Sequence, residues 1–380
     1  MQSTPLVSVV TPFYNTRDYL AECIESVLAQ TYPNWEYVLV DNWSTDGSGD
    51  IANRYAARFP DKIRFIRTDS FLSQVQNYNF ALSRISPESK YCKVVQADDF
   101  LFPECLRLMV EAAEHDSTIG VVGSYSLEGR YVAFDGLPYP SRLVTGSAIG
   151  RLFFLDNVYL FGSPTQLLLR SDLIRNRTPF YDEAYAPFED VAAAFGFLTQ
   201  CNFAFVHQVL TFTRRDNPSA MGAISNLDYV EPFNLLMLRA FGRKYLSPVE
   251  YEQQLQKKER IYADVLVNRA ICFRGKDFWN FHRGMLGRMG YSLKSPHVWR
   301  LLLLGLGTSL FSPKSAGNFQ CGFQRLVGMA RRLAKKVLMP GSSMKRIPSL
   351  KKAPERENMV GAVQELQQER HGRYSATKRN

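Results

Sequence analysis

The chain has 380 residues, 46% of them apolar, and a net charge of +10. This length and composition allow a large buried core, which excludes disorder throughout and favours one main domain with an extension. The charge is uneven, because residues 1–230 hold 18 Lys and Arg against 26 Asp and Glu, whereas residues 231–380 hold 28 against 10. We therefore expect an anionic partner for the second half.

The six cysteines lie far apart and form no C-x-x-C pair, so neither a zinc site nor a disulfide framework is indicated. Residues 1–6 lack the basic start of a secretory signal peptide. Both observations favour a cytoplasmic protein.

The first 115 residues alternate strand-like and helical patterns. We expect strands at 6–11, 35–40, 63–67 and 91–96, and helices at 17–30, 47–59, 74–86 and 103–114. This order predicts an α/β fold with a mostly parallel, doubly wound sheet flanked by helices, in which ligands bind beyond the carboxyl ends of the strands.

The remainder of the chain is less regular. Short apolar runs occur at 120–125, 158–161 and 166–170, and we expect a helix at 188–198 and a strand at 203–213. A helical pattern follows from about residue 231, and the mixed polar composition from residue 341 onward is typical of a disordered tail.

Two loops after the first strands could bind a nucleotide. Pro12, Tyr14 and Asn15 follow the first strand, where a base could lie, although an ordinary turn into a helix explains them equally well. Asp41 ends the second strand and could accept a hydrogen bond from a base or ribose. Its alternative role is a helix cap, which suits Asp46 better.

Two pairs of acids could carry chemistry. Asp98 and Asp99 directly follow an apolar strand, and adjacent carboxylates repel unless a cation or hydrogen-bond donors offset them. A divalent ion shared with a diphosphate would do so, whereas the alternative is a solvated turn before the next helix. Glu189 and Asp190 begin a helix, where a general base and a favourable helix terminus are both open interpretations.

The order and spacing of these segments resemble the family 2 glycosyltransferases, which have the GT-A fold. The resemblance covers about the first 220 residues. It is carried by residues 8–15, 19–20, 26–36, 44–48 and 97–99 with Asp41, Asn79 and Ala81, and more loosely by residues 162–164, Arg170 and residues 188–190.

The resemblance implies an inverting transfer of sugar from a nucleotide-sugar, most often a UDP-sugar, to a hydroxyl acceptor. Pro12, Tyr14 and Asn15 would border the base and Asp41 would bind it. Asn79 would belong to the nucleotide-sugar site, and Asp98 would hold the ribose or diphosphate. A Mg²⁺ or Mn²⁺ cofactor would be ligated by Asp99 together with Asp98. Asp190 would be the catalytic base, and Glu189 would position the loop or the acceptor.

The sequence departs from the family at three places. Gln96 stands where many members have Asp, Tyr78 where many have Arg, and the arginines Arg214 and Arg215 lack a histidine that often follows. Either arginine could still contact the diphosphate, since a guanidinium matches phosphate geometry. For His207, borne on a strand, we expect a structural role.

The resemblance also divides the chain. We expect a GT-A catalytic domain at 1–230, with nucleotide-sugar binding in 1–115 and the acceptor side in 116–230. A basic helical extension would occupy 231–340 and a disordered tail 341–380.

Two segments of the extension could lie on an anionic inner membrane face. Residues 298–311 are apolar but too few to span a bilayer, and residues 323–338 form a basic amphipathic pattern. The alternative is a helix packed in a core. A peripheral membrane location would suit a lipid-linked glycan acceptor in surface polysaccharide synthesis.

Two rival functions remain at this point. A soluble or protein acceptor is one, with the basic half serving oligomerisation. A non-catalytic sugar-nucleotide or glycan-binding protein is the other, because Gln96, Tyr78 and the missing histidine are departures in the site. No nucleic-acid-binding motif accompanies the positive charge, so nucleic acid is not an expected partner. The sequence does not indicate the oligomeric state, the sugar or the linkage.

Overall fold

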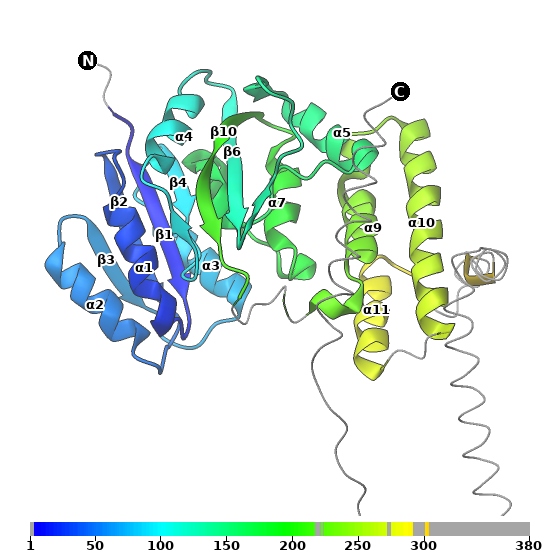
Figure 1. Cartoon of the computed structure of the whole chain (residues 1–380), viewed down its shortest axis with the longest axis horizontal. Helices are drawn as coiled ribbons and strands as arrows, with labels where there is room; N and C mark the ends of the chain where they lie inside the picture. The colour runs from blue at the N-terminus through cyan, green and yellow to red at the C-terminus, as the bar shows by residue number, and fades with distance from the viewer. Residues whose placement is uncertain (1–3, 217–221, 223, 272–274, 292–300, 304–380) are drawn as a thin grey trace, which may run out of the picture. The chain divides into compact units, whose positions relative to one another are not determined.

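The computed structural model describes residues 4–216, 222, 224–271, 275–291 and 301–303. All of these lie in a compact unit, Met1–Phe323 (Figure 1). The second unit, Gln324–Asn380, lies outside the described residues. The expected amphipathic helix at 323–338 and the expected tail at 341–380 therefore also lie outside them, as does the segment 298–311 apart from 301–303.

The described strands form a single sheet. Its order is β3-β2-β1-β4-β9-β6-β10-β5, with β7 paired to β6 and β8 paired to β10. The bounds are β1 Val7–Phe13, β2 Trp35–Asp41, β3 Ile63–Arg67, β4 Tyr91–Val94, β5 Phe100–Leu101, β6 Ile119–Glu128, β7 Tyr131–Ala133, β8 Leu143–Val144, β9 Leu168–Arg170 and β10 Asn202–Thr213.

The sheet is mostly parallel, as expected. Strands β1 to β4 are parallel to one another, and β10 is parallel to β6, while β9 runs antiparallel to both β4 and β6. All seven residues of β1 are buried, which is typical of a parallel strand covered on both faces. The last long strand, β10, lies inside the sheet between β6 and β5.

Helices cover both faces of the sheet. Their bounds are α1 Arg17–Leu28, α2 Ser48–Arg58, α3 Gln74–Leu82, α4 Cys105–Ala113, α5 Gly146–Asp156, α6 Ser171–Arg175 and α7 Glu189–Phe197. One core lies under α1, α2 and α4, and a second core lies under α3, α5 and α7. Helix α1 shows why: its buried residues Leu20, Cys23, Ile24 and Val27 follow helical spacing.

Three further helices continue the second core. They are α9 Val230–Phe241, α10 Pro248–Ile271 and α11 Lys276–Arg288. Phe233 of α9 lies 4.7 Å from the Phe188 ring, and Phe241 lies 5.6 Å from Phe195 of α7. Arg151 of α5 forms an ion pair of 2.6 Å with Glu250 of α10. The helical region expected after residue 231 is thus present, and it packs directly on α5 and α7.

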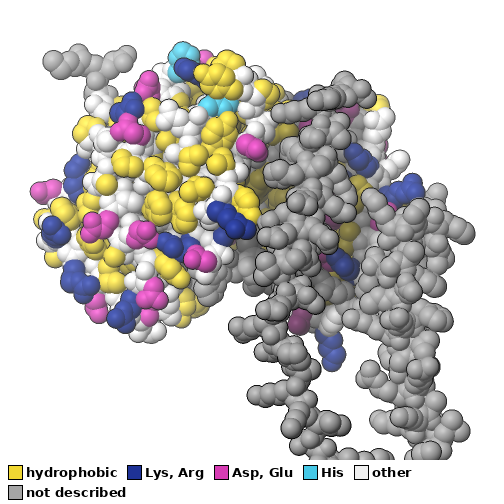
Figure 2. Space-filling view, viewed as in Figure 1, with side chains coloured by type: hydrophobic (Ala, Val, Ile, Leu, Met, Phe, Trp, Pro, Cys, Tyr) yellow, Lys and Arg dark blue, Asp and Glu magenta, His cyan; other side chains and the backbone are white. Residues whose placement is uncertain are grey.

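No helix of the described residues combines the length and the apolar character that a bilayer span requires. On the face drawn in Figure 2, Lys and Arg are interspersed with Asp and Glu over the described part of the sheet region.

Candidate active site

The carboxyl ends of β1, β2 and β4 bring the expected nucleotide loops together. Phe13 at the end of β1 pairs with Asp41 at the end of β2, and Asn42 donates its backbone N–H to Phe13 O. On the other side of β1, Val95 donates to Val10 O, so that the Gln96–Asp99 turn follows at the same edge. The three segments that the sequence pointed to are neighbours at this edge.

Asn15 fastens the first loop to the second. Its backbone adopts a left-handed conformation, with φ 51°, its N–H donates to Ser44 Oγ at 3.0 Å, and its Oδ1 accepts from Thr45 N at 2.9 Å. Asp46 accepts from Arg17 N and Ser48 N, the first residues of α1 and α2. Asp46 thus accepts N–H groups at the start of both helices, but from the position before Gly47, which is the N-cap of α2. Asn15 has a structural contact besides any role toward a base.

Asp41 is a buried acid, and one of its two carboxylate oxygens has no hydrogen-bond partner in the described structure. It is fully buried, and its Oδ1 accepts from Ser44 N at 2.8 Å. Its Oδ2 has no hydrogen-bond partner in the described structure, although Arg67 Nε lies 3.7 Å away. A Cβ on Gly49 would lie 2.8 Å from that oxygen, so the first turn of α2 covers it closely. An oxygen in this condition is an acceptor that a ligand N–H could satisfy.

Exposed aromatic rings surround this edge. The rings of Tyr14 and Phe71 meet edge to face at 5.0 Å, and they are 45% and 61% exposed. Trp43 is also exposed, has φ 64°, and carries the Arg67 guanidinium over its ring. The sequence motifs did not indicate Trp43 or Phe71 as candidate site residues. Their one sequence signal is that each is a large aromatic residue in an otherwise polar loop.

Asp99 faces the protein interior. Its Oδ2 accepts from Thr165 Oγ1 at 2.7 Å and from Thr213 Oγ1 at 3.4 Å, and its Oδ1 accepts from Arg214 N at 3.0 Å. Burial, and then the charge of Asp98, raise the pKa of Asp99 to about 7. Asp98 is the more exposed of the two. Asp99 thus fastens two distant segments to the turn.

Gln96 joins the same network. Its Oε1 accepts from Ser163 Oγ at 2.7 Å, and its backbone N–H donates to Thr165 Oγ1 at 3.0 Å. Tyr78, the second departure from the family, is buried and hydrogen-bonds Gln96. Tyr78 and Gln96 are therefore hydrogen-bonded to each other. The amide of Gln96 makes these contacts at a position where many family members have a carboxylate.

Asn79 is hydrogen-bonded to the backbone of Tyr181. Its Nδ2 donates to Tyr181 O and its Oδ1 accepts from Tyr181 N, both at 2.8 Å. The side chain expected in the nucleotide-sugar site thus clamps the segment that leads to α7.

Glu189 and Asp190 are the first residues of α7. Burial, and then the charge of Glu189, raise the pKa of Asp190 to about 8. Asp190 Oδ1 accepts from Val191 N at 2.8 Å, whereas Glu189 Oε2 is buried without a hydrogen-bond partner in the described structure. Burial also raises the pKa of Glu189.

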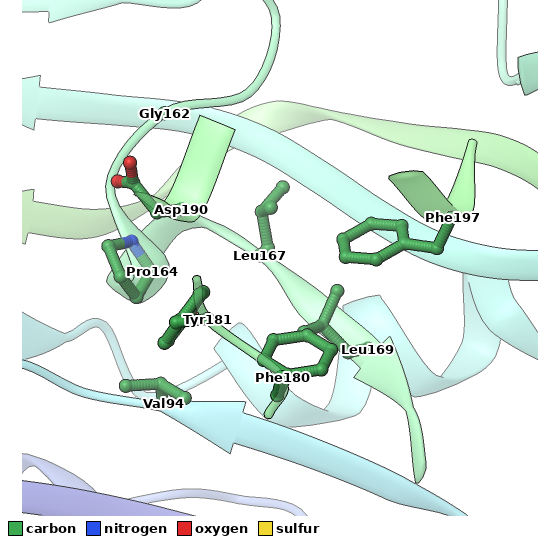
Figure 3. Close-up of a pocket in the computed structure, with 9 residues that line it drawn as sticks. All are labelled: Val94, Gly162, Pro164, Leu167, Leu169, Phe180, Tyr181, Asp190 and Phe197. Atoms are coloured by element: carbon green, nitrogen blue, oxygen red, sulfur yellow. The ribbon is translucent and has the colours of Figure 1, made fainter. Parts of the chain in front are cut away.

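Asp190 lies at one end of a small apolar cavity (Figure 3). Its carboxyl group is beside Gly162 and Pro164, and it is the one carboxyl group among the nine described lining residues. The others are Val94, Leu167, Leu169, Phe180, Tyr181 and Phe197. The carboxyl group therefore has little water on its inner side, which is the physical reason for its raised pKa.

The arginines after β10 are engaged with the protein. Arg214 donates to Asp98 O at 3.1 Å, pairs with Glu22, and lies over the Tyr19 ring. Arg215 forms an ion pair of 2.6 Å with Glu128. Arg214 is thus adjacent to the acidic turn, and Arg215 lies at the end of β6.

His207 has the structural role that we expected. Its Nδ1 lies 2.9 Å from Tyr125 Oη and its Nε2 lies 2.7 Å from Ser141 O.

The described residues contain no group of three or more His, Cys, Asp or Glu arranged to hold a metal ion. A cation at the Asp98–Asp99 turn would have two carboxylates from this part of the protein.

Comparison with known proteins agrees with this architecture. Residues 8–177 match the family model described as glycosyl transferase family 2. GlyG, a glycosyltransferase of Streptococcus pneumoniae, is 28% identical over 309 residues, which are 72% of this chain and 96% of GlyG.

Two further relatives come from Bacillus subtilis. The putative glycosyltransferase EpsE is 39% identical over 124 residues, which are 33% of this chain and 44% of EpsE. The putative teichuronic acid biosynthesis glycosyltransferase TuaG is 34% identical over 134 residues, which are 35% of this chain and 50% of TuaG. The matched stretch spans half or less of these two relatives.

Among solved structures, S. aureus TarS 1-349 in complex with UDP has a TM-score of 0.54 at 17% identity, covering 86% of this chain and 91% of that chain. The complex of the same protein with UDP-GlcNAc has a TM-score of 0.50 at 19% identity and covers 79% of each chain. At these identities the likeness shows the fold alone. The fold is that of the GT-A glycosyltransferases.

The match to glycosyl transferase family 2 extends over residues 8–177, which include strands β2 to β9 and all of β1 except Val7. The family resemblance and the fold class expected from the sequence are both confirmed.

Proposed function

We propose that this protein transfers a sugar from a nucleoside diphosphate sugar to a hydroxyl group of a glycan, with inversion at the anomeric carbon. The observation that carries the proposal is Asp190, a carboxyl group at the start of α7 beside an apolar cavity, with its pKa raised to about 8. A general base works best when its pKa is near the working pH.

In the proposed reaction the acceptor oxygen forms a bond to the anomeric carbon as the bond to the diphosphate breaks. Asp190, as the carboxylate, takes the proton of the acceptor hydroxyl, and the bonding electron pair leaves with the nucleoside diphosphate. A single displacement of this kind inverts the anomeric carbon. Glu189 supports the base by its charge, which raises the proton affinity of Asp190.

For the donor we propose the carboxyl edge of β1, β2 and β4. Tyr14 offers an exposed ring to a base, and Pro12 and Asn15 are its neighbours in the chain. The Oδ2 of Asp41, which has no hydrogen-bond partner in the described structure, is the acceptor that we assign to a base N–H. A UDP-sugar is the first candidate, because TarS has been solved with UDP and with UDP-GlcNAc.

We further propose that a Mg²⁺ or Mn²⁺ ion binds at the Asp98–Asp99 turn. Asp99 already accepts three hydrogen bonds, which leaves room for about one more contact on a carboxylate with roughly four lone-pair positions. Mg²⁺ is commonly held by one or two carboxylates together with substrate phosphates and water, so the two acids fit such a site. The bound ion would neutralise charge on the departing diphosphate.

The proposed acceptor is a surface polysaccharide or lipid-linked glycan. TuaG bears the name of a teichuronic acid biosynthesis enzyme, and the charge bias of residues 231–380 suits an anionic membrane surface. A location in the cytoplasm, peripheral on the inner membrane face, belongs to the same proposal.

The test is release of nucleoside diphosphate from a panel of UDP-, GDP- and TDP-sugars, with Mn²⁺, with Mg²⁺ and with EDTA. We expect metal-dependent release that Asp190→Asn reduces by at least about 100-fold, the range for loss of a positioned base. Asp99→Asn should also reduce it, because this substitution removes one of the two carboxylates proposed to hold the metal ion. Asp61→Asn is the matched control, since Asp61 is exposed in the turn before β3, at the opposite edge of the sheet. Nucleotide-sugar binding without release from any donor would instead favour a non-catalytic sugar-nucleotide-binding protein.

A further inference from the structure

Tyr159 is an exposed aromatic residue close to the proposed base. Its ring is 39% exposed and follows α5, on the acceptor side of the fold. Behind it lie the buried rings of Phe134, Phe153 and Phe161, with centroids 5.8, 6.1 and 6.1 Å from its own. Three packed rings hold the orientation of the fourth, and part of the Tyr159 side chain remains exposed to solvent.

The hydroxyl end of Tyr159 points inward. Its Oη lies 2.8 Å from the place that a Cβ on Gly162 would occupy, and Gly162 lines the cavity of Asp190. Burial raises the pKa of the Tyr159 hydroxyl well above its usual value, and the charges of Asp190 and Glu128 raise it further. The charge of Arg215 lowers it. Phe134, which packs on the Tyr159 ring, directly follows β7, and β7 pairs with the end of β6 that holds Glu128.

This combination has the features that a sugar ring requires. A pyranose has an apolar face of C–H groups, which can stack on an aromatic ring, and an edge of hydroxyls, which need hydrogen-bond partners. Tyr159 supplies the apolar surface. Glu128 is 23% and Arg215 47% exposed, and together they offer an acceptor and several donors.

We infer that Tyr159 is the stacking surface of the acceptor site, and that the acceptor is a pyranoside whose reacting hydroxyl is directed toward Asp190. Glu128 and Arg215 bind other hydroxyls of the same ring. The inference rests on the proposed function and names the substrate class of its acceptor site. Tyr159 is a positioning residue here, since it takes no proton.

The experiment uses the full chain, its best donor, and a panel of p-nitrophenyl pyranosides as acceptor probes. We expect at least one pyranoside to accelerate nucleoside diphosphate release by the wild type. Tyr159→Ala should raise the KM of that pyranoside about tenfold, while the KM of the donor changes less than twofold. Tyr159→Phe and Tyr159→Trp keep an aromatic face and should stay within about threefold of the wild-type acceptor KM. Tyr131→Ala, which removes a ring 61% exposed on β7, is the matched control.

Three results would overturn the inference: an unchanged acceptor KM in Tyr159→Ala, an equal rise of both KM values, or hydrolysis of the donor that no pyranoside accelerates. Failure of the proposed function itself is a different result, namely no release from any donor by the wild type.

Discussion

Asn79 and Tyr181, 102 residues apart in the chain, exchange two hydrogen bonds of 2.8 Å between an amide side chain and a backbone. A second link joins the same segments, because Ser73 at the start of α3 donates to Glu183. Helix α3 thereby holds the segment that precedes Asp190. The position of the proposed base is thus coupled to a residue that the family resemblance assigned to the nucleotide-sugar.

Asn79→Ala tests this clamp. We expect kcat to fall about tenfold while the Kd of UDP changes less than twofold, and the free energy of unfolding to drop by about 1–3 kcal/mol for the unpaired backbone groups. Asn53→Ala, at an exposed position of α2, is the control. Calorimetric titration with UDP decides the matter, since a large loss of affinity would make Asn79 a nucleotide ligand instead.

Asp190→Asn should stabilise the protein while it removes activity. Because the pKa of Asp190 is about 8 in the folded protein and 3.8 for an ordinary Asp, wild-type folding near pH 7 requires the carboxyl group to take up a proton. The protonated carboxyl group of Asp190 therefore contributes its full stability to the folded protein only below the unfolded-state pKa. This contribution decreases as the pH rises and is lost above about pH 8. The variant has no such dependence.

Thermal unfolding of wild type and Asp190→Asn from pH 4 to pH 9 measures this effect. We expect the melting temperature of the variant to exceed that of the wild type by roughly 2–4 °C above pH 7, and the difference to shrink toward pH 4. A lower melting temperature for the variant at every pH would show that the carboxylate is stabilised in the folded protein.

Thr165→Val tests the network around Asp99. The substitution removes the hydroxyl that donates to Asp99 and accepts from Gln96 N, with little change of shape. We expect urea unfolding to show a loss of about 1–3 kcal/mol, because two buried polar groups lose a partner. Thr199→Val is an exposed control. Equal effects of the two variants would argue against a tight Asp99 network.

Two glycines should respond in opposite ways to alanine. A Cβ on Gly146 would lie 1.9 Å from Leu198 O and 2.3 Å from Cys201 O, whereas Gly284, inside α11, has nothing within 4 Å. We expect Gly146→Ala to cost roughly 2–4 kcal/mol and Gly284→Ala to gain up to about 1 kcal/mol. Denaturant midpoints of the two variants measure this, and a tolerated Gly146→Ala would mean that α5 packs less closely on the turn between α7 and β10.

Truncation separates the contributions of the later segments. A chain ending at residue 230 loses Phe233, Phe241 and the partners that these rings have on Phe188 and Phe195. We expect it to aggregate, because a continuous part of the core becomes exposed. A chain ending at residue 303 keeps every described contact, and its melting temperature should stay close to that of the full chain.

The chain that ends at residue 303 also tests membrane binding. Residues 304–380 hold 15 Lys and Arg against 4 Asp and Glu. Vesicles containing anionic lipid should therefore co-sediment the full chain and leave the 1–303 chain in solution, and salt should weaken the binding. Equal sedimentation of both chains would contradict the proposal that the basic segment binds the membrane.

The parallel half of the sheet could be predicted because its signals are local. Strands β1 to β3 alternate with helices of regular spacing, and each motif follows its strand directly. Helix α5 could not be predicted, since Gly146 and Gly150 weaken a helical pattern. Both glycines are required by close packing, Gly146 against carbonyls after α7 and Gly150 against the Tyr245 ring.

The side-chain orientations in the site could not be predicted for a related reason. Asp99 receives hydrogen bonds from Thr165 and Arg214, which are 66 and 115 residues away, and no spacing within a motif encodes those partners. The adjacent acids could be recognised from the local sequence. The direction in which each side chain points depends on residues that are distant in the chain.

The contact between the aromatic rings of α9 and those at α7 limits where two related chains can be joined to make a chimera. A chimera joined at residue 230 would pair Phe188 and Phe195 of one parent with foreign residues at positions 233 and 241. Exchange of the helical region between relatives would therefore have to carry both sides of this contact, so that the natural unit of exchange includes α7 and its proposed base.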